Sequence, residues 1–206
     1  MPGEFRDFLI SDGFDEAHLQ KCAVLPDEID HDNIENNAVT HFAHSYKMEM
    51  KDGKPVWVAG DGMKKLEADC SQAIDFMKEG NLAMVRYFLA KSTHYCIDVL
   101  TYPHEHQGEL WEKHHTPWET MMGHFLTAHQ GEIGPLHSEP FSHIYRDMVG
   151  VARGAWQNGL NIGAALDAKT PINDDIWLAT CRMCISAVMS MWATMAKDLK
   201  IGKEAI

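Results

Sequence analysis

Residues 82–122 read LAMVRYFLAKSTHYCIDVLTYPHEHQGELWEKHHTPWETMM, and this stretch decides the fold prediction. Apolar side chains recur in it with the 3.6-residue period of an α-helix, and the same period continues on both sides. Most Gly and Pro residues lie in short connections between the periodic segments. We therefore expect an all-α fold. The expected helices run over about 35–47, 62–78, 81–101, 117–129, 139–157 and 173–199.

One segment, 46–60, departs from the helical pattern. There the runs YKMEM and PVWVA flank Lys51-Asp52-Gly53-Lys54. Asp-Gly between two short alternating runs is a hairpin signal, so we expect one small β-hairpin between two helices. No linker, repeat or low-complexity tract divides the chain. The 206 residues therefore indicate a single domain, 1–206.

The composition excludes several classes of protein. Lys plus Arg number 18 against 30 Asp plus Glu, a net charge of −12, and 45% of the residues are hydrophobic. These values are typical of a globular protein and exclude disordered and collagen-like chains. An acidic surface repels phosphate backbones and anionic headgroups, which argues against long nucleic acids as partners. A local cationic pocket made of metal ions is compatible with this charge.

The cysteines and the N-terminal residues bear on the compartment. Five cysteines make an odd count without framework spacing, which favours a reducing environment. No basic and apolar signal pattern begins the chain, so we expect a cytoplasmic protein as written, or a secreted one if this is a processed form. The apolar stretch 176–196 carries Arg182 and polar residues on every fourth position, which predicts a core helix and no transmembrane segment. Nothing in the pattern indicates an oligomeric state.

Histidines are the most informative residues. Nine of the 13 lie between His94 and His143. On the helix predicted over 81–101, His94 and Asp98 are four apart, so both project from one face and can bind one ion. Pro103 is expected to end that helix, after which a loop would fold His104 back towards the pair.

A second pair with the same spacing is His115 and Glu119. Metal binding is one interpretation. The other is helix capping, because Thr116-Pro117-Trp118-Glu119 has the form of a helix start with Thr as N-cap, Pro at the first position and Glu closing a capping box. The two roles are compatible.

The order of these residues resembles a known family. Asp27 precedes His41 by 14 residues, and His-xxx-Asp-xxxxx-His and His-xxx-Glu follow. This order resembles the zinc-dependent phospholipase C and S1/P1 nuclease superfamily, all-α enzymes with a cluster of three zinc ions. Two further features are similar to those of family members: the hairpin turn that follows His41, and the position of Trp192 in the last helix.

The resemblance implies a ligand set. One Zn²⁺ would be bound by four residues, Asp27, His41, His94 and Asp98. A second would be bound by His104, His115 and Glu119. In the family a third ion shares the bridging Asp with an early histidine and the terminal amine of a tryptophan. Here the chain starts Met-Pro and has no Trp before Trp57, and His18, the one early histidine before Asp27, is the candidate ligand of that third ion. Two to three zinc ions are therefore expected.

The expected function is a zinc-dependent phosphoric ester hydrolase, phospholipase C-like or nuclease-like. Its partners would be small-molecule or lipid phosphoesters, and Asp27 or Asp98 would serve as ligand or as general base towards water. One alternative is a helical metal-binding protein without turnover. Another is an HD-type phosphohydrolase using His31 and Asp32, although these lie in the acidic stretch DEIDHDNIENN, which is typical of a solvated loop.

Overall fold

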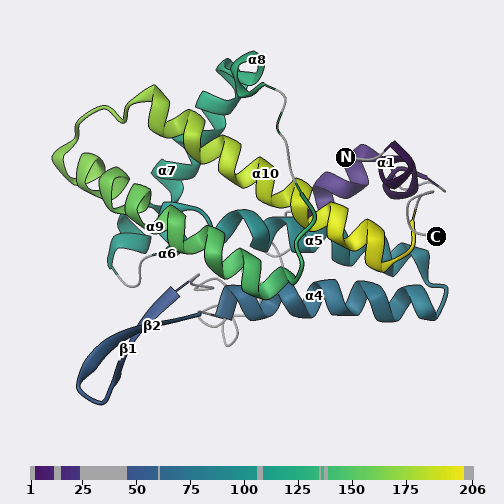
Figure 1. Ribbon diagram of the computed structural model, residues 1–206. Coiled ribbons are helices and arrows are strands. Elements are labelled where there is room, and N and C mark those ends of the chain that lie inside the picture. The colour runs from purple at the N-terminus through teal and green to yellow at the C-terminus, as the bar shows by residue number, and fades with distance from the viewer. Residues whose placement is uncertain are drawn as a thin grey trace.

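The computed structural model describes residues 3–11, 15–23, 46–59, 61–105, 109–134, 136 and 139–201, and this part is mostly helical (Figure 1). Residues 16–23 are helical. The expected helix over 35–47 lies outside the described residues except for its last two positions, which belong to a strand. The helices in chain order are α1 Gly3–Leu9, α4 Asp61–Lys78, α5 Leu82–Asp98, α6 Tyr102–Glu105, α7 Glu109–Ala128, α8 Gln130–Ile133, α9 Ile144–Ala168 and α10 Asp174–Asp198.

The main core lies where α4 and α5 pack together and α9 and α10 lie against them (Figure 1). Leu66, Leu89, Met148 and Met191 each bury their side chains completely in it. α1 adds Phe5, which stands 6.2 Å from the ring of Trp192 of α10, measured between ring centroids. The periodic apolar positions of the sequence therefore face one another, as the all-α prediction requires.

Capping side chains and a turn glycine determine where α5 and α10 begin. The Asn81 side chain accepts a hydrogen bond from the backbone N–H of Met84 and caps α5. Gly80, with φ of 74°, supplies the left-handed residue that the tight α4–α5 turn needs. The Asn173 side chain accepts from the N–H of Asp175 at the start of α10.

A second, smaller core lies between α6, α7, α9 and α10. Its large aromatic members are Trp118 of α7 and Trp177 of α10, whose ring centroids are 5.6 Å apart. Tyr102 of α6 and Ile162 of α9 complete the contact between the four helices. This core includes residues of α6 and α7, the helices that carry His104, His115 and Glu119.

The strands β1 Tyr46–Lys51 and β2 Lys54–Ala59 pair antiparallel, with Met48 opposite Trp57. Asp52 and Gly53 both have positive φ, 52° and 73°, as the favoured two-residue hairpin turn requires. Figure 1 shows the ribbon of this hairpin extending away from the helices.

Three predicted boundaries are wrong. α7 begins at Glu109 rather than at 117, so Thr116 and Pro117 lie inside a helix and the capping-box interpretation fails. α5 ends at Asp98, and His104 lies in the separate short helix α6 rather than in a loop. α9 begins at Ile144 and continues to Ala168, beyond the expected 139–157. At α7, Pro117 indicates a helix start locally, and packing against neighbouring helices outweighs that preference. At α6, Pro103 lies in the first turn of a new helix, where proline is tolerated.

The helix α10 is long and apolar enough, by length and composition alone, to cross a membrane. Core helices of globular proteins pass the same test. In the described part of the chain α10 packs against α5, α7 and α9, and one side of it, including Cys184 and Met191, is buried. These contacts bury one side of α10. The polar stripe is only partly at the surface, because its members Ser190 and Thr194 are buried.

Candidate metal centre

The last turn of α5 presents the first predicted pair. His94 Nε2 lies 2.9 Å from Asp98 Oδ2, so the i, i+4 spacing brings both side chains to one face. Both side chains are largely buried. The carbonyl end of a helix carries partial negative charge, which favours a cation near this turn.

The short helix α6 places His104 beside that pair. His104 Nε2 is 3.8 Å from Asp98 Oδ1, the carboxylate oxygen that does not face His94. Asp98 therefore stands between two histidines and presents one oxygen to each. The His104 side chain is only 6% exposed, which closes this side of the group from solvent.

The helix α7 contributes the remaining two side chains of the group, His115 and Glu119. His115 Nε2 lies 3.1 Å from Glu119 Oε1 and 3.2 Å from His104 Nε2. Glu119 Oε1 is 4.0 Å from His104 Nε2. Pro117, between the two ligands of α7, removes the helical hydrogen bond that the Lys113 carbonyl would otherwise accept.

Donor atoms of His104, His115 and Glu119 all lie within 4.8 Å of one another, as a shared metal ion requires. Two imidazole nitrogens and one carboxylate oxygen are a donor set that suits zinc, with a fourth position left for water or substrate. The residues therefore fit the metal that the resemblance implies. Glu119 is 50% exposed, so the group is open to solvent on its side.

The electrostatics favour ionised carboxylates. Burial opposes ionisation of Glu119, but the interactions with His104 and His115 outweigh it and lower its pKa to about 2. Burial likewise opposes ionisation of Asp98, yet the neighbouring His104 and His94 hold its pKa below the ordinary value. Burial disfavours a charge on His104, but Asp98 and Glu119 raise its pKa. The carboxylates thus keep the charge that binds a cation.

The structure brings together five of the predicted ligands: His94, Asp98, His104, His115 and Glu119. The predicted ligands Asp27 and His41, and the alternative pair His31 and Asp32, lie outside the described residues. His18 is exposed, its Nδ1 lies 2.7 Å from Asp15 Oδ1, and it is not a member of the His104 group among the described residues.

Two neighbours of this group were not predicted as site residues from the sequence. His114, a near-duplicate of His115, turns the other way and places Nε2 3.1 Å from Asp167 Oδ1 of α9. Tyr102 packs directly against the backbone of Gly163. The adjacent histidines could have indicated two different roles, because neighbouring helical residues point about 100° apart, whereas nothing in the local sequence marks the glycine contact.

A scan against protein-family models, a search of the curated proteins and a search of the solved structures each found no match for this chain. A function is therefore inferred from the residues of the candidate centre.

Proposed function

We propose that this chain is a zinc-dependent phosphoric ester hydrolase, phospholipase C-like or nuclease-like, in which a cluster of two to three zinc ions activates water. The observation that carries the proposal is the group His104, His115 and Glu119, whose donor atoms lie within 4.8 Å of one another. These are the three residues that the resemblance to the phospholipase C and S1/P1 nuclease superfamily assigns to one zinc ion. They come from two helices and are brought together by the fold.

A second ligand position supports more than one ion. His94 and Asp98 form a pair on α5, and Asp98 directs its other oxygen towards His104, 3.8 Å away. A carboxylate placed between two sets of imidazoles can serve both, as in multinuclear metal sites. The resemblance completes the His94 ion with Asp27 and His41, which lie outside the described residues.

Zinc bound by these residues would supply a water with a pKa lowered to about 7 and positive charge for the phosphoryl oxygens. The side chains divide the remaining tasks. His104, nearly buried, excludes water from the closed side, while the half-exposed Glu119 marks the side from which a phosphoester approaches. Asp98, kept ionised, faces His94 and His104 and would serve as a ligand or as general base towards water.

The substrate class follows from the charges. A chain with net charge −12 repels long polyanions, so a phospholipid headgroup or a small phosphodiester suits it better than a long nucleic acid. Bound metal ions would neutralise the site locally, so that a single phosphoester could enter it.

The test is hydrolysis of bis(p-nitrophenyl) phosphate and of phosphatidylcholine vesicles by the zinc-loaded protein. We expect turnover that is abolished by chelator and reduced by at least about 100-fold in His115→Ala, more than loss of an outer-sphere partner costs. His124→Ala is the matched control, because His124 is an exposed histidine on the same helix. Zinc binding without turnover of any phosphoester would favour the metal-binding protein without catalysis and refute the proposal.

A further inference from the structure

Gly163 of α9 lies where no side chain fits. A Cβ atom at this position would stand directly against Tyr102 Oη and 2.6 Å from Tyr102 Cζ. Carbon atoms in contact prefer about 3.5–4.0 Å, so the phenol ring occupies the space that any other residue would need. Gly163 is itself buried, which means that the ring rests on the α9 backbone inside the protein.

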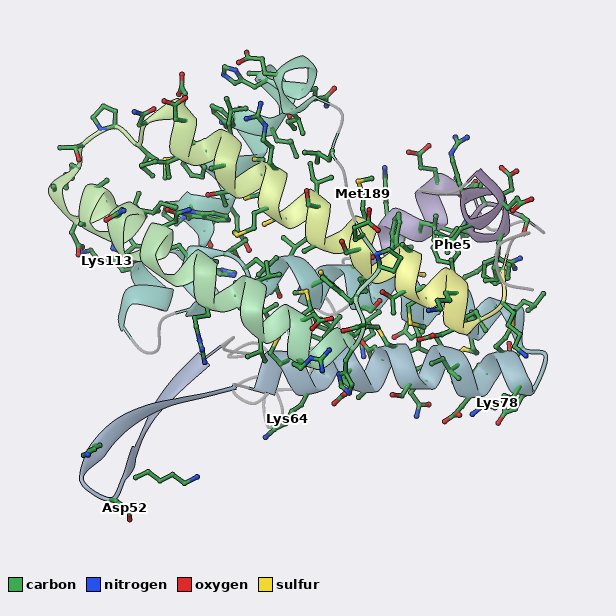
Figure 2. All side chains as sticks on the ribbon, viewed as in Figure 1. Phe5, Asp52, Lys64, Lys78, Lys113 and Met189 are labelled. Carbon is green, nitrogen blue, oxygen red and sulfur yellow. The ribbon has the colours of Figure 1, made fainter. Side chains whose placement is uncertain are left out.

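Tyr102 is held from two sides. Its side chain is buried, with the residue only 3% exposed. Its ring centroid lies 6.0 Å from that of His114 on α7. His114 in turn contacts Asp167 of α9, which also accepts a hydrogen bond from Lys113 of α7 (labelled in Figure 2). The ring is therefore seated between α9 and a residue of α7 that is itself fixed to α9.

The position of Tyr102 determines the position of His104. Both belong to α6, a helix of four residues. One helical turn has no stability of its own in water, so tertiary contacts must hold it in place. α6 packs against α9 and α7, and Tyr102 is its member in the second core. His104 follows two residues later with its Nε2 3.2 Å from His115 Nε2.

We propose that the contact between the Tyr102 ring and the backbone of Gly163 positions His104 in the metal centre. The contact fixes α6, and α6 fixes the distance of His104 from His115 and Glu119. Tyr102 and Gly163 are positioning residues and touch no metal. The inference rests on the proposed zinc site, because it assigns their role through His104.

The test compares two glycine substitutions in α9. Gly163→Ala places a methyl group against the Tyr102 ring, whereas Gly154→Ala, in the same helix, adds a methyl group that meets nothing within 4 Å. The probes are Zn²⁺ affinity, measured by competition with a chromophoric chelator, and the visible spectrum of the Co²⁺-loaded protein. We expect Gly163→Ala to weaken binding by about 10–100-fold, the range for loss of an outer-sphere support, and to change the Co²⁺ spectrum. Gly154→Ala should leave both unchanged.

A second variant separates positioning from a general loss of folding. Tyr102→Leu removes the ring without a clash in α9 and should weaken zinc binding by a similar factor. The double variant Gly163→Ala/Tyr102→Leu should bind no more weakly than Tyr102→Leu alone, because the methyl group then has no ring to displace. If the two substitutions acted independently, their effects on the free energy of zinc binding would instead add.

The outcomes distinguish this inference from the function on which it rests. Unchanged affinity and an unchanged Co²⁺ spectrum in Gly163→Ala, in a protein whose wild type binds the metal, would overturn the positioning role. A shift in thermal unfolding with an unchanged spectrum would overturn it as well. A wild type that binds neither Zn²⁺ nor Co²⁺ would refute the proposed function itself.

Discussion

Asp69 of α4 makes a contribution to stability that is lost as the pH rises. Its Oδ1 lies 3.3 Å from Lys91 Nζ, while its buried Oδ2 has no hydrogen-bond partner among the described residues. Burial outweighs the attraction of Lys91 and raises the pKa of Asp69 from 3.8 to about 6. The native state therefore binds the proton more tightly than the unfolded state does. The stability that Asp69 contributes is fully present when the group is protonated and is lost between about pH 4 and pH 6.

The magnitude follows from these two pKa values. At about 1.4 kcal/mol per pH unit, ionisation of Asp69 costs the native state about 3 kcal/mol above pH 7, and about 1 kcal/mol of this is already present at pH 4.5. Asp69→Asn removes the ionisation. We expect the free energy of unfolding of the variant, relative to wild type, to increase by about 2 kcal/mol between pH 4.5 and pH 7.5.

The assay is urea unfolding of both proteins at the two pH values, with chelator present so that metal binding does not contribute. Other carboxylates titrate in both proteins and cancel in the difference. A difference that does not change with pH would refute the reasoning, because it would show that the native structure does not raise the pKa of Asp69.

Three further outcomes are expected. Leu89→Ala, at a fully buried position of the main core, should lower the free energy of unfolding by about 2–5 kcal/mol in a denaturant titration, and a loss below about 1 kcal/mol would show that the core is misassigned. Free Zn²⁺ at about 100 times its Kd should raise Tm by roughly 5–10 °C, an increase that chelator reverses; an unchanged Tm would argue against a site that forms only in the folded chain. Asp98→Asn should lower zinc stoichiometry as measured by calorimetry, whereas Asp175→Asn, an exposed acid at the start of α10, should not; equal stoichiometry in both variants would remove Asp98 from the ligand set.

The helices with strong periodicity could be predicted from sequence. The structure has α4, α5 and α10 within a few residues of the expected segments, because each buries one continuous apolar face. The first turns of α7 could not be predicted. Their sequence, ELWEKHHT, has little apolar periodicity and is followed by Pro117, so local preference indicates a boundary that packing overrides.

The candidate site divides in the same way. The pairs His94–Asp98 and His115–Glu119 are local, since i, i+4 spacing on a helix places them together without further information. The approach of His104 to both pairs depends on how α6 packs between α7 and α9, which no spacing encodes. The resemblance to a zinc enzyme family supplied that prediction.

The most direct test of the proposed metal centre is the zinc content of the protein, measured by mass spectrometry after purification without chelator, beside a His94→Ala variant. We predict two or three zinc ions per chain in the wild type and fewer in the variant. Well-folded protein with no metal above background would contradict the proposal, because the candidate centre would then be an ordinary group of packed histidines and carboxylates.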